Sequence, residues 1–265
     1  MESATELVKS TDWRRRLGRE VQRLGKAVLD LLYPPVCLNC SAPIAMADGL
    51  CADCFRTLRP ITAPLCPRLG LPFDSYLGPD ALSAEALADP PPFGRARSAV
   101  IYDEVARTIV SRLKYGDRPE LARFCARLMA VGGHELWDGG PILVPIPLHP
   151  SRQRQRRYNQ SAELARALGQ LTGLRVDATL LRRSRKTRQQ VGLSGAGRLR
   201  NVAGAFAAHP DIARRSGGRR IVLVDDVYTT GATIKAATRC LLKSGVTAVD
   251  VVSFARVVTG ADFPI

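Results

Sequence analysis

The sequence has no apolar run of the roughly 20 residues that a membrane-spanning helix needs, although 46% of its 265 residues are hydrophobic. Its first residues, MESATELVKSTDWRRRLGRE, lack the apolar core of a signal peptide. Acidic residues are few: 24 Asp and Glu face 39 Lys and Arg, which gives a formal net charge of +15. We therefore expect a cytoplasmic globular protein without a membrane span, whose surface attracts polyanions such as pyrophosphate-bearing small molecules, nucleic acid or anionic lipid.

Two common phosphate-binding motifs are also missing. The sequence contains no GxxxxGK[ST] stretch and no GxGxxG stretch. These motifs cradle nucleoside triphosphates and dinucleotides respectively. Their absence argues against a P-loop NTPase and against a Rossmann-type dinucleotide-binding domain.

The positive charge is concentrated in one segment. Between Ser151 and Arg200, thirteen Arg or Lys residues face two acids, an excess of eleven positive charges in fifty residues. A field of this strength suits polyanionic ligands. A solvated face of an Arg-rich protein explains the same pattern equally well. Aromatic residues that could stack on nucleobases are sparse there, essentially Tyr158 alone.

Hydrophobic periodicity predicts an N-terminal helix and a separate α/β domain. Residues 1–33 carry one apolar stripe at helical spacing among many arginines, so we expect a basic amphipathic helix, which favours packing onto its own domain over membrane binding. Residues 67–94 are rich in Pro and Ala with little periodicity, so we expect a linker there. No internal repeat is apparent.

Alternating short strands and helices follow in residues 95–260. Strands are predicted in SAVIY, PILVPIPL, RRIVLVDD and VTAVDVVSFARVV, with helical segments between them. Apolar strands separated by helices predict an α/β fold with a mainly parallel sheet covered on both faces. In such sheets ligands bind beyond the carboxyl ends of the strands.

Four cysteines are spaced as metal ligands. They form two CxxC pairs ten residues apart, namely Cys37, Cys40, Cys51 and Cys54. Four thiolates arranged tetrahedrally would hold one structural Zn²⁺ with no open position for a substrate. We therefore expect a zinc ribbon over residues 34–66; two coincidental pairs or a redox pair are the alternatives. Cys66 has no CxxC partner, because the residue three positions later is Leu69.

The stretch IVLVDDVYTTGAT, residues 221–233, joins a buried strand to two acids and a hydroxyl-rich turn. Asp225 and Asp226 would stand at the top of the sheet, where carboxylates accept hydrogen bonds from vicinal hydroxyls. The turn offers backbone N–H groups, three threonine hydroxyls, a glycine and the start of a helix, which together suit a phosphate. A diol at one end and a phosphate at the other describe a ribose 5-phosphate.

This stretch resembles the phosphoribosyl pyrophosphate (PRPP) motif of type I phosphoribosyltransferases. Three further segments resemble the ComF family of competence-associated proteins, which join a zinc ribbon to a phosphoribosyltransferase domain: VPIPLHPSRQRQRRYNQSAELA, RSRKTRQQVGLSGAGRLRNVAGAF and IVSRLKYGDRPELA. The last contains Lys114 and Tyr115. The resemblance covers Tyr33 to about Val258. It departs from the family in Arg157, which replaces a glycine, and in the lone Cys66, so we expect one zinc ion and not two.

The resemblance implies a phosphoribosyltransferase fold over residues 95–260 and a set of site residues. Those implied to hold PRPP are Asp225 and Asp226 at the ribose and Thr229, Thr230, Gly231, Ala232 and Thr233 at the 5-phosphate. Those implied to cradle pyrophosphate are Pro145, Ile146, Pro147, Arg156, Asn159 and Gln160. A loop over about residues 183–193 would close over it, with Arg185 or Lys186 stabilising the leaving group. Mg²⁺ would accompany PRPP, mainly on substrate oxygens.

Two functions are consistent with these features. The first is an enzyme that transfers phosphoribosyl to an unidentified nitrogenous acceptor, in nucleotide metabolism or DNA uptake. The second is a non-catalytic PRPP sensor that binds single-stranded DNA and works with a competence helicase. Neither Val227 nor Tyr228, which follow the acids, is an obvious catalytic base. The sequence leaves open whether the protein forms an oligomer.

Overall fold

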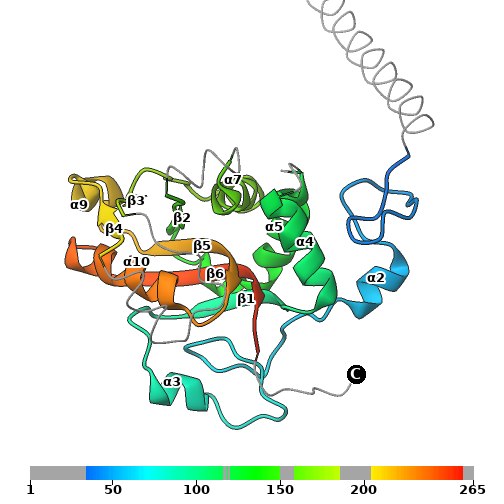
Figure 1. Cartoon of the computed structure of the whole chain (residues 1–265). Helices are drawn as coiled ribbons and strands as arrows, with labels where there is room; N and C mark the ends of the chain where they lie inside the picture. The colour runs from blue at the N-terminus through cyan, green and yellow to red at the C-terminus, as the bar shows by residue number, and fades with distance from the viewer. Residues whose placement is uncertain (1–33, 116–117, 119, 150–157, 186–203, 259–265) are drawn as a thin grey trace, which may run out of the picture. The chain divides into compact units, whose positions relative to one another are not determined.

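The structure is a computed structural model that describes residues 34–115, 118, 120–149, 158–185 and 204–258 (Figure 1). The chain divides into two compact units between Asp53 and Cys54. The helix expected over residues 1–33 lies outside the described residues. None of the helices in the described ranges has the length and apolar character needed to cross a membrane.

The first unit contains a tight backbone knuckle around its first cysteine pair. Val36 and Pro43 form an isolated antiparallel bridge. Within this bridge the Cys37 N–H donates to the Ala42 carbonyl at 2.7 Å. Ser41 completes the turn with a positive φ of 64°. The turn brings both cysteines of the CxxC pair to one side of the backbone.

The second unit is built on a four-stranded parallel sheet in the order β1-β6-β5-β2 (Figure 1). The strands are β1 (Ala96–Ile101), β6 (Val249–Arg256), β5 (Ile221–Tyr228) and β2 (Ile142–Pro145). Strand β6 is buried along its whole length, as its mainly apolar sequence predicts, and its polar residues Asp250, Ser253 and Arg256 are buried with it. The parallel sheet of the predicted α/β fold is confirmed.

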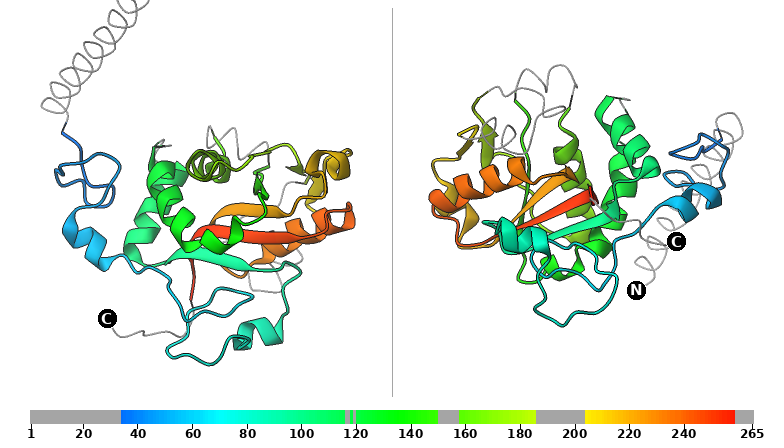
Figure 2. Two further views of the ribbon diagram at one scale, coloured as in Figure 1. Left: turned by 180° about the vertical axis from the view of Figure 1, so that it is seen from behind. Right: turned by 60° about the horizontal axis from the view of Figure 1, so that its bottom comes forward.

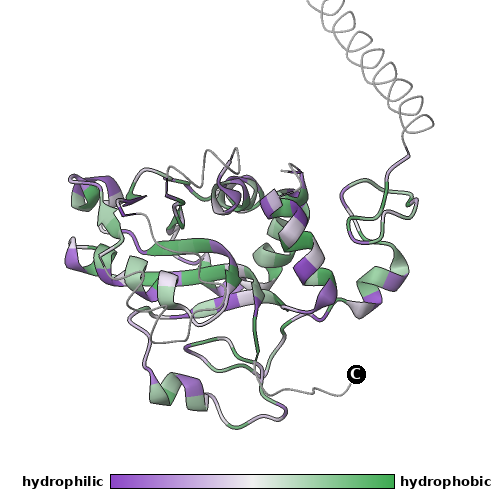
Figure 3. Cartoon of the chain, in the orientation of Figure 1, coloured by the Kyte–Doolittle hydropathy of each residue, from purple (hydrophilic) through white to green (hydrophobic). Residues whose placement is uncertain are grey.

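Helices cover both faces of this sheet. Helices α4 (Glu104–Tyr115), α5 (Leu121–Gly132) and α7 (Gln160–Thr172) pack together, with α5 and α7 on the strands. Helix α10 (Ala232–Lys243) packs on β6 from the opposite face (Figures 1 and 2). Figure 3 shows the strands as the most continuously hydrophobic elements, as expected for a sheet covered on both faces.

A small hairpin stands beside α10. It consists of β3 (Leu181–Arg183) and β4 (Phe206–Ala208), which pair antiparallel and are followed by the short helix α9 (Ile212–Ser216). The Arg183 guanidinium stacks over the Phe206 ring at 5.3 Å. The loop expected over about residues 183–193 leaves this hairpin at β3, and residues 186–203 lie outside the described part of the chain.

The segment 67–94 differs from the linker expected there. It contains the short helix α3 (Ala84–Ala88), and Leu69, Ala86 and Phe93 are almost completely buried in the main hydrophobic core. The short helix α2 (Ala52–Thr57) lies earlier in the chain. The segment escaped prediction because isolated apolar residues between prolines carry no helical or strand period.

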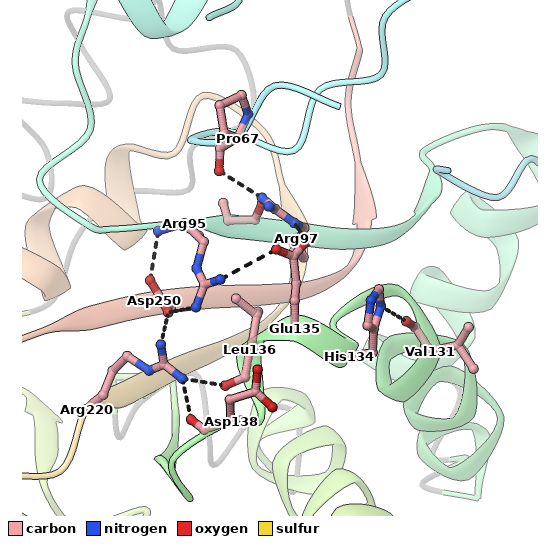
Figure 4. Close-up of polar contacts among 11 residues, drawn as sticks. Pro67, Arg95, Arg97, Val131, His134, Glu135, Leu136, Asp138, Arg220 and Asp250 are labelled. Carbon is pink, nitrogen blue, oxygen red and sulfur yellow. Dashed lines mark hydrogen bonds and ion pairs between the residues drawn. The ribbon is translucent and has the colours of Figure 1, made fainter. Parts of the chain in front are cut away.

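A cluster of ion pairs lies at the amino-terminal ends of the strands (Figure 4). Asp250, near the start of β6, is 3% exposed and accepts the Arg95 N–H at 2.8 Å and an Arg220 guanidinium at 3.2 Å. Glu135 binds the guanidinium groups of both Arg95 and Arg97. Because this edge is opposite to the carboxyl ends of the strands, we assign the cluster a structural role.

Candidate functional site

Two adjacent carboxylates lie near the carboxyl end of the interior strand β5. Asp225 and Asp226 are its fifth and sixth residues, followed by Val227 and Tyr228. The Asp226 N–H donates to Asp225 Oδ1 at 3.0 Å, and Asp226 is only 5% exposed. Such burial is costly for a carboxylate unless other groups satisfy it.

Side chains from two helices satisfy this pair. The Lys114 ammonium, in the last turn of α4, lies 2.9 Å from Asp226 Oδ2. Gln160 Nε2 donates to the same oxygen at 3.2 Å, and Ser161 Oγ donates to Asp225 Oδ1 at 3.0 Å. The carboxylates are thus held in fixed orientations by the end of α4 and the start of α7.

Asp225 does not titrate as an ordinary surface carboxylate. Burial, followed by the negative charge of Asp226, raises the pKa of Asp225 to about 7, although Lys114 and the hydrogen bond from Ser161 oppose the shift. Asp225 therefore changes its charge close to neutral pH. Such perturbed carboxylates are enriched at functional sites.

The turn after β5 presents groups suited to a phosphate. Thr229 and Thr230 are exposed, Gly231 adopts a left-handed φ of 70°, and α10 begins at Ala232, with Thr233 in its first turn. The N–H groups at the start of a helix point outward along its axis and attract an anion. The five residues predicted for the 5-phosphate thus form one continuous stretch that follows the acids after two intervening residues and runs from the turn into α10.

Position 231 must be a glycine because the Tyr228 side chain packs against it. A Cβ at this position would lie 2.3 Å from Tyr228 Oη. The Tyr228 ring is fully buried, meets Phe93 edge to face at 6.3 Å and lies 4.2 Å from the Arg256 guanidinium carbon. Burial raises the pKa of Tyr228 to about 12. Tyr228 therefore supports the turn from below and is unsuited to act as a base.

The residues predicted to cradle pyrophosphate are Pro145, Ile146, Pro147, Arg156, Asn159 and Gln160. Pro145 ends β2, and Ile146 and Pro147 follow it. Asn159 Nδ2 donates to the Ile146 carbonyl at 3.1 Å, so the N-cap of α7 holds this loop. Gln160 contacts Asp226 instead, and Arg156 lies outside the described residues.

Of the two residues predicted to stabilise the leaving pyrophosphate, Arg185 and Lys186, the structure describes only the first. Arg185 is exposed, two residues beyond the end of β3. Lys186 lies outside the described residues. Their proposed role therefore rests on the family resemblance.

The four predicted metal ligands converge. The Sγ atoms of Cys37, Cys40, Cys51 and Cys54 all lie within 4.8 Å of one another. The Cys40 and Cys51 sulfurs are 3.7 Å apart, close to the roughly 3.8 Å edge of a tetrahedron with Zn–S bonds of about 2.3 Å. The cluster therefore fits a closed structural Zn²⁺ site, and within the described ranges it is the one group of three or more candidate ligands that meets this geometry.

Backbone donors also prepare Cys37 for a metal. The Cys51 N–H donates to Cys37 Sγ at 3.2 Å. Although burial acts in the opposite direction, hydrogen bonds from the backbone at Cys40, Cys51 and Asn39 lower the pKa of Cys37 to about 6. Such donors stabilise the thiolate form that binds zinc.

Sequence reasoning missed three side chains around the acids and the turn. Lys114 was noted only for its family resemblance, and Ser161 and Arg256 were given no role. A lysine at the C-terminal end of a helix carries no signal of its own, because such residues usually complement the helix dipole. The contacts of all three depend on which helix and strand ends meet in the fold.

Comparison with known proteins places these features in one family. Residues 28–86 match a double zinc ribbon domain. DNA utilization protein YhgH of Salmonella typhi is 33% identical over 227 residues, covering 83% of this chain and 96% of that protein. Competence protein F of Haemophilus influenzae is 28% identical over 227 residues, with the same two coverages. Competence protein ComFC of Bacillus subtilis is 28% identical over 204 residues, covering 75% of this chain and 80% of that protein. This chain belongs to the ComF family of competence and DNA-utilization proteins.

Proposed function

We propose that this protein binds PRPP with Mg²⁺ and transfers its phosphoribosyl group to a nitrogenous acceptor. In this proposal Asp225 and Asp226 hold the ribose hydroxyls, and residues 229–233 hold the 5-phosphate. One observation carries the proposal: paired, fixed carboxylates near the carboxyl end of an interior parallel strand are followed, after two intervening residues, by a hydroxyl-bearing turn at the start of helix α10.

The acids and their neighbours suit a diol. A ribose offers two adjacent O–H donors, and carboxylates accept without competing donors of their own. Gln160 adds a further acceptor, because its Oε1 is buried and has no hydrogen-bond partner among the described residues. A bound hydroxyl would satisfy this oxygen, which is otherwise costly to bury.

Mg²⁺ would be held mainly by the pyrophosphate oxygens of the substrate. This ion keeps several water ligands and uses few protein carboxylates. Asp226 already binds Lys114 and Gln160, which favours hydroxyl recognition by this residue over direct coordination. When bound, Mg²⁺ would neutralise charge on the leaving pyrophosphate.

The proposed reaction exchanges one bond at the anomeric carbon. The bond to pyrophosphate breaks, and a bond to the acceptor nitrogen forms. Arg185 and Lys186 would stabilise the developing charge on pyrophosphate, as cations do in phosphate-releasing sites. Because Tyr228 is buried with a raised pKa, the proton of the acceptor must leave by another route.

Calorimetric titration with PRPP and Mg²⁺ tests the binding step. We expect binding by the wild type and a loss of affinity of at least roughly tenfold in Asp225→Asn and Asp226→Asn, since each removes a charged acceptor. Asp138→Asn, an exposed acid near the amino-terminal end of the sheet and so opposite to the site, is the matched control. Unchanged affinity in both site variants would refute the assignment.

Pyrophosphate release tests the catalytic step separately. The wild type would be incubated with PRPP, Mg²⁺ and a panel of purine, pyrimidine and amine acceptors. Release with at least one acceptor, lost in Asp226→Asn, supports a transferase. Binding of PRPP without release under any of these conditions would identify a sensor instead.

A second candidate function is binding of single-stranded DNA in DNA uptake or utilization. It is supported by the eleven excess positive charges between Ser151 and Arg200 and by the names of the relatives. With few aromatic residues in that segment, phosphate contacts would dominate. The affinity for an oligonucleotide should then fall steeply as salt rises. Failure to bind at low salt would remove this candidate.

A further inference from the structure

The segment Pro64–Phe73 repeats the backbone of the first cysteine knuckle, Pro35–Ile44, 29 residues later. Three backbone N–H to carbonyl hydrogen bonds recur at equivalent positions in the two segments. In the first segment they run from Cys37 to Ala42 (2.7 Å), from Ser41 to Cys37 (3.0 Å) and from Ile44 to Pro35 (2.9 Å). In the second they run from Cys66 to Leu71 (2.8 Å), from Gly70 to Cys66 (2.8 Å) and from Phe73 to Pro64 (2.9 Å). The isolated bridge Val36–Pro43 likewise recurs as Leu65–Pro72. The expectation of no internal repeat is therefore corrected.

The turn residue follows the same pattern. Ser41 has a φ of 64°, and its counterpart Gly70 has a φ of 61°. At Gly70 the glycine is also needed for packing, because a Cβ would lie 2.4 Å from the Ala96 carbonyl. The second knuckle thus keeps the turn of the first and lies closely against β1.

The second pair of ligand positions is repeated as well. Cys51 precedes helix α2 and donates its N–H to Cys37 Sγ at 3.2 Å. Ser83 precedes helix α3 and donates its N–H to Cys66 Sγ at 3.4 Å. Three residues further along, Cys54 of α2 corresponds to Ala86 of α3.

We propose that Pro64–Asp89 is a second zinc ribbon in which apolar packing has replaced the metal and which now braces the phosphate-binding turn. The four ligand positions are occupied by Cys66, Leu69, Ser83 and Ala86. Leu69 and Ala86 are 1% and 3% exposed and belong to the hydrophobic core, as does Cys66. Their burial supplies the stabilisation that thiolate ligation supplies in the first ribbon.

The metal-free ribbon forms hydrogen bonds and an ion pair with an arginine at the carboxyl end of strand β6. Arg256, the last residue of β6, is completely buried. Its Nη1 donates to the Leu69 carbonyl at 2.8 Å, and its Nη2 lies 3.3 Å from both carboxylate oxygens of Glu85 on α3. The same guanidinium stacks on Tyr228. Tyr228 in turn lies directly beneath Gly231.

A second contact reaches the other side of the turn. Lys235, in the first helical turn of α10, is 2% exposed and lies 2.6 Å from Asp89 Oδ2, just after α3. Residues on both sides of the 229–233 turn are therefore tied to the same short ribbon. The role of this ribbon in holding the turn for PRPP rests on the proposed function, whereas the inference that the ribbon has lost its metal does not.

Restoring the ligands tests the loss of the metal. The full-length variant Leu69→Cys/Ser83→Cys/Ala86→Cys should bind two zinc ions per chain by elemental analysis, against one in the wild type. Adding Cys66→Ala to this variant should return the content to one. The Leu69 substitution keeps the backbone carbonyl that Arg256 uses. A folded triple variant that still binds one zinc would overturn the proposal.

A single substitution keeps the test decisive if the triple variant does not fold. Cys66→Ala in the wild type should leave the zinc content at one per chain. A fall to zero would show that Cys66 is a ligand and would refute the metal-free assignment. Two zinc ions in the wild type would refute it as well.

The brace is tested by Glu85→Gln, with Glu104→Gln as the matched control because both glutamates lie in the first turn of a helix. We expect Glu85→Gln to weaken PRPP binding by at least roughly fivefold with zinc content unchanged, and the control to leave both unchanged. Equal PRPP affinity in the two variants would refute the brace. If the wild type binds no PRPP, the proposed function fails and the zinc results still decide the metal-free assignment.

Discussion

Replacing Asp225 by Asn should stabilise the protein at neutral and alkaline pH. Asn keeps an oxygen that can accept from Ser161 Oγ and from the Asp226 N–H, as Asp225 Oδ1 does now. It removes the negative charge that burial and Asp226 both disfavour. The substitution therefore relieves an electrostatic cost and leaves the hydrogen-bond geometry in place.

The size of this effect follows from the raised pKa. Asp225 shifts from 3.8 to about 7 on folding, and each unit corresponds to about 1.4 kcal/mol, so the cost is at most about 4 kcal/mol. Because the folded-state pKa is the higher one, the stability contributed by the protonated group is fully present below pH 3.8. It is lost as the pH rises through about 7.

Urea unfolding of the wild type and of Asp225→Asn across pH 4 to 8.5 measures this difference. The two proteins should be nearly equally stable at the acidic end, and the variant should gain progressively toward pH 8. Asp80→Asn, which makes the same change at an exposed acid, is the control. A difference between Asp225→Asn and the wild type that is the same at every pH would refute the reasoning.

Three further predictions concern the same chain. Lys114→Gln should destabilise the protein by about 3 kcal/mol, measured by urea unfolding, because it removes the ion-pair partner of the buried Asp226 carboxylate; equal stability would contradict this. Gly231→Ala should cost about 2–4 kcal/mol and lower the melting temperature, because it combines left-handed strain with a clash against Tyr228; an unchanged melting temperature would show that the turn can relax. Cys40→Ala should reduce bound zinc below one per chain in elemental analysis, and full zinc retention would exclude this cysteine as a ligand.

The parts of the site that sequence alone predicted are those carried by contiguous residues. Asp225, Asp226 and the following turn form one stretch, and the end of a parallel strand delivers them together. Lys114 and Ser161 reach the acids only because the end of α4 and the start of α7 meet at that edge. Such meetings depend on helix packing, which hydrophobic periodicity does not specify.

The second ribbon shows a different limit of sequence reasoning. Zinc ribbons are recognised by their cysteines, and three of the four ligand positions here hold Leu69, Ser83 and Ala86. The repeat is preserved in backbone hydrogen bonds and in the turn at Gly70. Backbone geometry of this kind tolerates many side chains, so it leaves little trace in residue identity.

The first turn of α7 links the loop after β2 to the two acids, so ligands at these two places would change each other's affinity. Asn159, Gln160 and Ser161 are consecutive, and they hold the loop after β2, Asp226 and Asp225 respectively. A ligand that reorients either acid would therefore also shift the first turn of α7 and the loop at Ile146 that Asn159 holds. By thermodynamic linkage, if a ligand at the acids changes the affinity of a ligand at the loop by some factor, the ligand at the loop changes the affinity at the acids by the same factor. In the proposed PRPP site, three adjacent side chains would thus couple the loop after β2 to the two acids.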